Sequence, residues 1–150
     1  MKSKGRTFSV DRAEDSTGFL LWQVTNLWQR EIRKALKPYE VTHSQFVLLA
    51  SIQWFALQHA EITQILLSNH TQIDPMTTST VLRALESKQL ISRQEHSTDT
   101  RAKTVALTEK GAAVAKRAIR TVEKFDHDFF SRLGAEEPAF NRHILKLLSP

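Results

Sequence analysis

Apolar side chains recur every three or four residues along most of this chain, which is the spacing of helices with one buried face. The stripe of residues 16–37 consists of Leu20, Val24, Leu27, Trp28, Ile32 and Leu36. The stripe of residues 108–134 consists of Ala112, Ala115, Ile119, Val122, Phe125 and Phe129. A last helix begins at Pro138 and carries Phe140, Ile144, Leu147 and Leu148. The two ends of the chain are therefore expected to be helical.

The segment 42–59 has the features of a central, buried helix. Thr42 and Gln45 stand at the spacing of a capping box, in which each side chain satisfies the backbone N–H of the other. Val41 and Phe46 occupy the positions of a hydrophobic staple around that cap. Residues 41–60 hold no Asp, Glu, Lys or Arg, but their longest apolar run is too short to span a membrane.

Two shorter helices and two strands are expected next. Thr63 is suited to cap a helix over 64–70, and Asp74 followed by Pro75 is a strong start signal for a helix over 75–88. Val81, Leu82 and Leu85 would face inward from the second of these. Strands over 91–95 and 103–107 flank a polar loop. This order predicts a mainly α fold with a small β-hairpin wing, a winged helix-turn-helix.

The helix over 75–88 would be the recognition helix, whose first turns meet base edges in the major groove. Adjacent hydroxyl side chains are unusual in a helix, but hydroxyls can bond to bases or phosphates, and a Thr methyl can pack on thymine. The candidate DNA contacts here are Met76, Thr77, Thr78, Ser79, Thr80 and Arg83. A solvated helix start rich in capping residues is the plainer interpretation, with Arg83 paired to Glu86 or Ser87.

The hairpin supplies a second group of candidates. Arg93, Arg101 and Lys103 are cationic, and an arginine is favoured in a narrow minor groove by its negative potential. Asp99 cannot attract a phosphate, so its role would be to hold an arginine or to cap backbone amides of the loop. Its partner is either Arg101 or Arg93. The alternative is a solvated hairpin tip with a weak ion pair.

Composition limits the number of domains and the kinds of site and partner to a modest extent. A chain of 150 residues is most simply one domain, and the absence of cysteine excludes disulfides and thiolate metal sites. The net charge of +5 permits a polyanionic partner without requiring one. The first fifteen residues hold no apolar stretch of signal-peptide length, so a cytoplasmic protein with no membrane association is expected.

The stretch LESKQLISRQEHSTDTRAKTVALTEKG, residues 85–111, resembles the MarR family of bacterial transcriptional regulators. The matching features are its Leu-Glu, Leu-Ile, Asp-x-Arg and Leu-Thr-x-x-Gly motifs, and VTHSQFVLL (41–49) matches as well. The resemblance implies a single domain over 1–150, with a winged lobe at 42–107 and dimerisation helices at 16–37 and 108–148. It also implies a homodimer on a pseudo-palindromic double-stranded operator. Arg101 would enter the minor groove, supported by Asp99.

Family members often respond to small aromatic or phenolic acids bound between the dimer region and the lobe. Trp22, His43, Phe46 and Trp54 are the residues that could line such a site here, unless they are ordinary core or interface residues. The chain also departs from the family pattern. Gln72 and Gln89 replace common glycines, Leu66 replaces a frequent acid, and Thr80 stands where many members are basic.

The terminal helices favour a dimer independently of the resemblance. They carry apolar residues that one small lobe could not easily cover, namely Phe19, Leu21, Trp22, Phe130, Phe140 and Leu147. Exposed apolar stripes of this kind need a partner, and two-fold pairing is the commonest arrangement.

The function expected from these observations is a dimeric DNA-binding repressor modulated by a small effector. A winged-helix module that binds protein instead of DNA is the alternative, and a metal-responsive regulator is another because the chain has six histidines. His127 lies beside Asp126 and Asp128, but neighbours on a helix point in different directions. No metal site, cofactor or catalytic residue is predicted, since no phosphate loop, HExxH or nucleophile motif is present.

Overall fold

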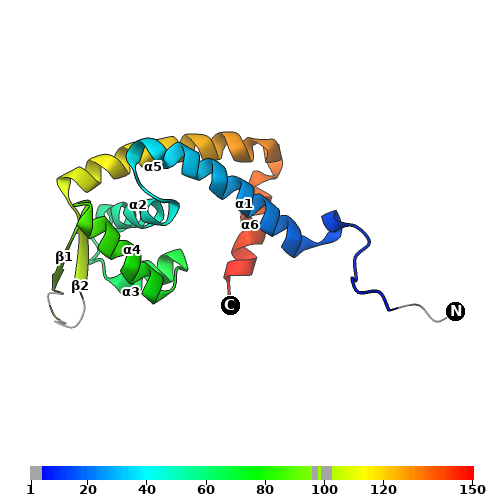
Figure 1. The fold of residues 1–150 in the computed structure, drawn as a ribbon, viewed down its shortest axis with the longest axis horizontal. Helices are drawn as coiled ribbons and strands as arrows, with labels where there is room; N and C mark the ends of the chain where they lie inside the picture. The colour runs from blue at the N-terminus through cyan, green and yellow to red at the C-terminus, as the bar shows by residue number, and fades with distance from the viewer. Residues whose placement is uncertain (1–4, 96–97, 99–102) are drawn as a thin grey trace.

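The computed structural model describes residues 5–95, 98 and 103–150, and Figure 1 shows its fold. The helices and strands of this part of the chain are α1 (Thr17–Leu36), α2 (His43–Leu57), α3 (Gln64–Thr71), α4 (Pro75–Ser87), β1 (Ile91–Glu95), β2 (Lys103–Leu107), α5 (Glu109–Phe130) and α6 (Glu137–Leu148). Short 3₁₀ turns are η1 (Ala13–Asp15), η2 (Lys37–Tyr39) and η3 (Ser131–Glu136). The prediction of a mainly helical chain with a small hairpin is confirmed.

Side chains cap most helix starts, and the caps at Thr42, Thr63 and Asp74 are the ones that the sequence predicts. Ser16 and Thr63 each accept a backbone N–H from the third residue beyond, and both halves of the Thr42–Gln45 capping box are formed. Helix α2 ends at Leu57 rather than near 59, because His59 takes a left-handed backbone conformation (φ 53°). Local side-chain chemistry thus determines where the helices begin.

The core surrounds α2, which packs against α1, α3, α4, α5 and β2. The fully buried large apolar residues are Ile32, Leu36, Leu48, Leu49, Ile52, Leu67, Leu82 and Leu85. The prediction of α2 as the centre of the core is therefore confirmed for most of its length. Its last turns differ, because Trp54 and Leu57 are exposed.

The two strands form an antiparallel hairpin that is attached to the lobe at its inner end. Ile91 pairs with Leu107 at that end, and Glu95 pairs with Lys103 at the outer end. The segment before α3 adds a second attachment that the sequence pattern did not indicate: the Val105 N–H donates to the Ile62 carbonyl at 2.8 Å. The hairpin is therefore fixed against α3 as well as projecting beyond α4.

Helices α1 and α5 run side by side along one edge of the molecule, and α6 descends from the far end of α5 (Figure 1). The prediction that Ala112 lies on the buried face of α5 was wrong. Ala112 is exposed, while Gly111 and Ala118 are buried instead. The reason is that α5 begins against the turn after α4, which sets the rotation of the helix from its first turn.

The apolar stripe of α1 is only half covered. Ile32 and Leu36 are fully buried, whereas the N-terminal half of α1 and the C-terminal half of α6 leave large apolar side chains exposed. These residues are Phe19, Leu20, Leu21, Trp22, Val24, Leu27, Ile144, Leu145, Leu147 and Leu148. We refer to them as the terminal apolar surface. Among the described residues, no helix is long and apolar enough to cross a membrane.

Candidate nucleic-acid interface

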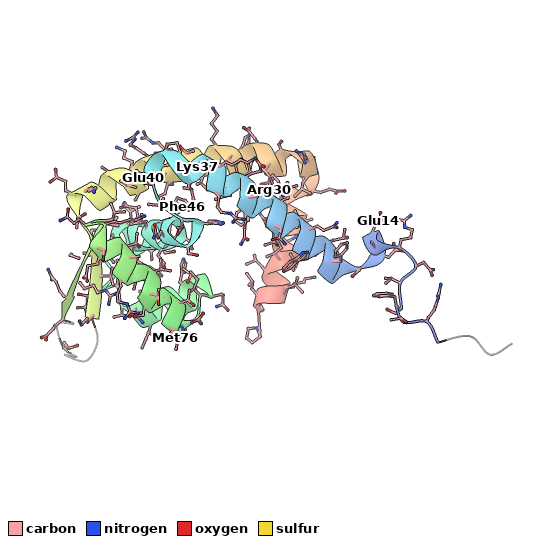
Figure 2. The ribbon with its side chains drawn as sticks, viewed as in Figure 1. Glu14, Arg30, Lys37, Glu40, Phe46 and Met76 are labelled. Atoms are coloured by element: carbon pink, nitrogen blue, oxygen red, sulfur yellow. The ribbon has the colours of Figure 1, made fainter. Side chains whose placement is uncertain are left out.

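Helix α4 presents its first turn at the outer face of the lobe. The Asp74 side chain caps the helix by accepting the Thr77 backbone N–H at 2.8 Å and the Thr77 hydroxyl at 2.6 Å. These hydrogen bonds from Thr77 lower the pKa of the Asp74 carboxyl, so the cap is ionised and complements the positive end of the helix dipole. Met76 is 80% exposed and marks the lower edge of the lobe in Figure 2.

Among the recognition-helix candidates, Thr78 has a buried side chain. Its side chain is 0% exposed, and its hydroxyl donates to the Asp74 carbonyl at 2.9 Å. A residue one position after Thr77 points about 100° away around a helix, which here is toward the core. The prediction that Thr78 contacts DNA was therefore wrong, and its role is to pack the start of α4 onto the lobe.

The exposed face of α4 is made by Met76, Thr77, Thr80 and Arg83, whose spacing follows one side of the helix. Ser79 is half-buried at the edge of this face. The guanidinium Nη2 of Arg83 donates to the Thr80 hydroxyl at 3.4 Å, rather than pairing with Glu86 or Ser87. We call these four residues the α4 face; it offers hydroxyl groups, one thioether and one cation.

The turn between α3 and α4 is built without glycine. Gln72 takes a left-handed backbone conformation (φ 62°), and the Ser68 hydroxyl donates to the Ile73 carbonyl at 2.6 Å. Gln89, after α4, has a φ of 61°. Both positions are those where the family pattern has glycine, so the backbone geometry is kept at the steric cost that a side chain brings there.

Arg93 lies at the junction of β1 and α4. Its side chain is only 14% exposed, its Nη2 donates to the Ser79 carbonyl at 3.3 Å, and its Nε lies 3.9 Å from a Glu86 carboxylate oxygen. The predicted DNA contact of Arg93 stays untested, but its guanidinium is turned onto α4. It connects β1 to the recognition helix and so positions the wing.

The remaining wing candidates divide in two. Lys103 is exposed at the outer end of β2, opposite Glu95 in the hairpin register. Asp99 and Arg101 lie outside the described residues. The partner of Asp99, either Arg101 or Arg93, therefore stays a prediction.

The Leu-Thr-x-x-Gly motif joins α5 to the end of α4. Thr108 caps α5 by accepting the Gly111 backbone N–H at 2.9 Å, and its hydroxyl donates to the Gln89 carbonyl at 2.6 Å. The Thr108 backbone N–H donates to the Leu90 carbonyl at 3.1 Å. The motif therefore sets the angle at which the long helix leaves the lobe.

The residues proposed for an effector pocket do not form one enclosed site. Phe46 is buried in the hydrophobic core, whereas Trp22 is 68% exposed on α1 and Trp54 is 58% exposed on α2. His43 is half-buried and contacts Trp28 edge-on, with ring centroids 5.1 Å apart. The effector pocket therefore stays a prediction, since apolar type alone does not separate core, surface and cavity positions.

A polar cluster at the junction of α1, α2 and α5 was not predicted. The Trp28 indole N–H donates to Asp126 at 2.8 Å. Burial raises the pKa of the Asp126 carboxyl, although the Trp28 hydrogen bond and His43 oppose this. Burial also lowers the pKa of His43, against the attraction of Asp126. The available signal was spacing: Asp126 lies four residues after Val122, on the apolar face of α5.

Within residues 5–95, 98 and 103–150, no group of three or more His, Asp or Glu side chains is placed to hold an ion.

Comparison with known proteins matches this architecture. Residues 37–126 match the family model for ArnR1-like winged-helix domains. The HTH-type transcriptional regulator YdcH of Bacillus subtilis (strain 168) is 41% identical over 122 residues, covering 81% of this chain and 83% of that protein. The HTH-type transcriptional repressor Rv2887 of Mycobacterium tuberculosis is 31% identical over 131 residues, covering 87% and 91%.

Solved structures agree. A mutant of MarR from Escherichia coli, complexed with operator DNA, has a TM-score of 0.77 at 27% identity and covers 94% of this chain and 100% of its own. CouR from Rhodococcus jostii RHA1, bound to p-coumaroyl-CoA, has a TM-score of 0.75 at 22% identity, covering 92% and 93%. The second likeness concerns the fold alone.

Proposed function

This chain belongs to the MarR family of winged helix-turn-helix transcriptional regulators, and on that premise we propose that it is a homodimeric repressor of the bacterial cytoplasm that binds a pseudo-palindromic operator. It has a DNA-binding winged helix, and its relatives are transcriptional regulators rather than enzymes. The repressor assignment is supported by the repressor name that the mycobacterial relative carries.

The α4 face is the observation that carries the proposal. Met76, Thr77, Thr80 and Arg83 lie on one exposed side of a helix whose opposite side is anchored by Leu82 and Leu85 in the core. A rigidly held helix with exposed threonines and a cation suits base reading in the major groove, where Thr contacts several bases and Arg favours guanine. The wing, with Lys103 and Arg101, would contact the neighbouring backbone and minor groove.

The terminal apolar surface supports a dimer of this chain. Its side chains come from both the first and the last helix, and exposed apolar surface of this extent indicates an interaction site that a partner covers. Two-fold pairing of identical surfaces covers both copies at once. It would also place two α4 helices about 34 Å apart, one turn of duplex, which is why we propose a pseudo-palindromic site.

A small-molecule effector completes the proposal. The solved structure of CouR holds p-coumaroyl-CoA, which supports the idea that this fold accommodates an anionic organic ligand. In a regulator such a ligand acts by binding one conformation of the dimer more tightly than another.

Selection of bound sequences from random duplex DNA by the full-length protein tests the function. The expected result is an inverted repeat whose half-sites are about ten base pairs apart, centre to centre. Recovery of no enriched sequence, with no duplex retained even at low salt, would contradict DNA binding and favour a protein-binding winged helix. Recovery of a single, unrepeated half-site would contradict the two-fold arrangement.

A further inference from the structure

A cavity of about 450 Å³ lies where three segments meet, on the side of the lobe away from α4's first turn. Its walls come from η2, from the turn after α4 and from the first half of α5. We call it the basic cavity, because three cations line it: Lys88, Lys110 and Arg117. The volume falls in the range of sites for small organic ligands.

The three cations have no carboxylate partner among the described residues. Lys88 donates to the Glu40 carbonyl at 2.6 Å and to Gln45 Oε1 at 2.8 Å, and Lys110 donates to the Lys88 carbonyl at 3.3 Å. An ammonium group has three N–H donors, so Lys88 keeps one and Lys110 keeps two. The guanidinium of Arg117 lies over the Tyr39 ring, 5.5 Å from its centroid.

The charge at the cavity is uneven. Glu40 is the one acidic residue in its lining, and its carboxylate forms no ion pair within the described part of the chain. Three cations against one carboxylate leave a net positive charge that attracts an anion, and guanidinium and ammonium groups bind carboxylate and phosphate through charge-assisted hydrogen bonds.

The remaining lining is apolar. Pro38, Leu90, Val114 and the Tyr39 ring supply hydrocarbon surface beside the cations. A site that combines a few polar groups with apolar walls recognises an organic molecule rather than a bare ion. We infer that the basic cavity binds a small organic anion, with its carboxylate or phosphate toward Lys110 and Arg117 and its apolar body against Leu90 and Val114.

Operator DNA is not the anion that binds in the basic cavity. Figure 2 places Glu40, at the cavity, and Met76, on the α4 face, at opposite edges of the lobe. A duplex lying along the α4 face would therefore not reach the cavity. The cations there are best explained by a second, smaller anion.

Binding at this place would act on the recognition helix. Lys88 caps the end of α4, whereas Arg117 lies on α5, the helix that connects the lobe to the proposed dimer region. A ligand that contacts both sides of the cavity binds with an affinity that depends on the angle between α4 and α5. Its binding therefore favours one angle over others. This inference rests on the proposed function, and it gives the effector a site and a chemical class.

The test measures ligand binding to the full-length protein without DNA, by isothermal titration calorimetry. Phenyl phosphate and benzoate are the probes, benzamide is the uncharged comparison and inorganic phosphate is the bare anion. We expect at least one organic anion to bind at millimolar concentration or below, about tenfold more tightly than benzamide or inorganic phosphate. Arg117→Gln and Lys110→Gln should each weaken binding about tenfold, the effect of losing one charge-assisted hydrogen bond.

Arg120→Gln is the matched control, because Arg120 is an exposed arginine on α5 outside the cavity lining. It should bind the probes as the wild type does. Equal loss in Arg120→Gln, equal binding of inorganic phosphate, or no binding of either organic anion would overturn the inference.

The effect of the bound ligand on operator binding is tested separately. The bound probe should change operator affinity about fivefold or more in the wild type but not in Arg117→Gln. Binding without any change in operator affinity would overturn the regulatory role. Operator binding in the absence of a probe tests the proposed function itself, so the two failures are distinguishable.

Discussion

Gly111, in the first turn of α5, lies directly against the backbone of Leu90: a Cβ atom at Gly111 would stand 1.7 Å from the Leu90 carbonyl oxygen. The same carbonyl accepts the Thr108 backbone N–H, so it cannot move without breaking the joint between the hairpin and α5. The glycine of the Leu-Thr-x-x-Gly motif is therefore required by the close approach of two backbones, and its own φ lies outside the left-handed range.

Gly111→Ala should destabilise the protein by at least about 2 kcal/mol, because the added methyl group overpacks a backbone contact. Urea unfolding followed by circular dichroism measures the change in the free energy of unfolding. Gly18→Ala on α1 is the control: nothing lies within 4 Å of that position, so alanine should leave stability equal or slightly higher. Similar effects of the two substitutions would contradict the packing argument.

Thr78→Ala and Thr80→Ala apply one substitution to a buried and an exposed threonine of α4. Thr78→Ala should lower the free energy of unfolding by about 1–2 kcal/mol, since it loses a buried methyl group and a hydrogen bond. It should leave base preference unchanged. Thr80→Ala should leave stability within about 0.5 kcal/mol and alter the preferred bases in a selection experiment. A changed preference in Thr78→Ala alone would reverse the assignment.

Much of the fold followed from local signals, and the particular successes and failures show why. Asp74-Pro75 and the Thr42–Gln45 box are short-range chemistry, and both helices begin there. Thr78 and Thr77 look alike in sequence, but only the rotation of α4 on the lobe decides which is buried. The contact of Arg93 with the Ser79 carbonyl could not be predicted for the same reason, since it joins a strand to a helix fourteen residues earlier.

The basic cavity is the feature that the sequence predicts least. Tyr39, Lys88 and Arg117 come from three separate segments, and no spacing rule connects them. They meet because Thr108 and Gly111 fix the start of α5 against the turn after α4. Long-range proximity of this kind follows from packing and not from periodicity.

Substitutions of Arg101 and Arg93 should differ in how they change the salt dependence of operator binding. Arg101→Ala should weaken operator binding by on the order of 1–3 kcal/mol, because the resemblance assigns it to the minor groove. If it also neutralises a phosphate, the slope of log K against log salt should fall by about 1. Arg93→Gln should weaken binding with an unchanged slope, because its guanidinium is turned onto α4.

Fluorescence anisotropy titrations of a labelled operator at several salt concentrations give both quantities. Circular dichroism of each variant checks that it is folded. A reduced salt slope in Arg93→Gln would return that residue to the DNA interface, and unchanged affinity in Arg101→Ala would remove Arg101 from it.

The Trp28–His43–Asp126 cluster should make stability depend on pH. Burial lowers the pKa of His43, so the unfolded chain binds the proton more tightly, and stability falls as pH falls below its ordinary value of 6.5. Burial raises the pKa of Asp126, so the folded chain binds that proton more tightly, and stability falls as pH rises through the range just above its ordinary value of 3.8. The histidine effect is measured in the pH range around its ordinary value of 6.5.

Urea unfolding at several pH values in that range measures the slope for the wild type and for His43→Gln. The variant should lose part of the fall in stability toward low pH. His143→Gln on α6, where the side chain is exposed, is the control and should keep the wild-type slope. Identical slopes in all three proteins would exclude His43 as the source.

The most direct test of DNA binding by a dimer compares two duplexes of equal length and composition, the selected inverted repeat and its scrambled form, by anisotropy at physiological salt. The predicted result is binding of the repeat about a thousandfold more tightly than the scrambled duplex, by one dimer per site, with affinity that falls steeply as salt rises. Equal affinity for the two duplexes, or binding by a single copy of the chain, would contradict the account.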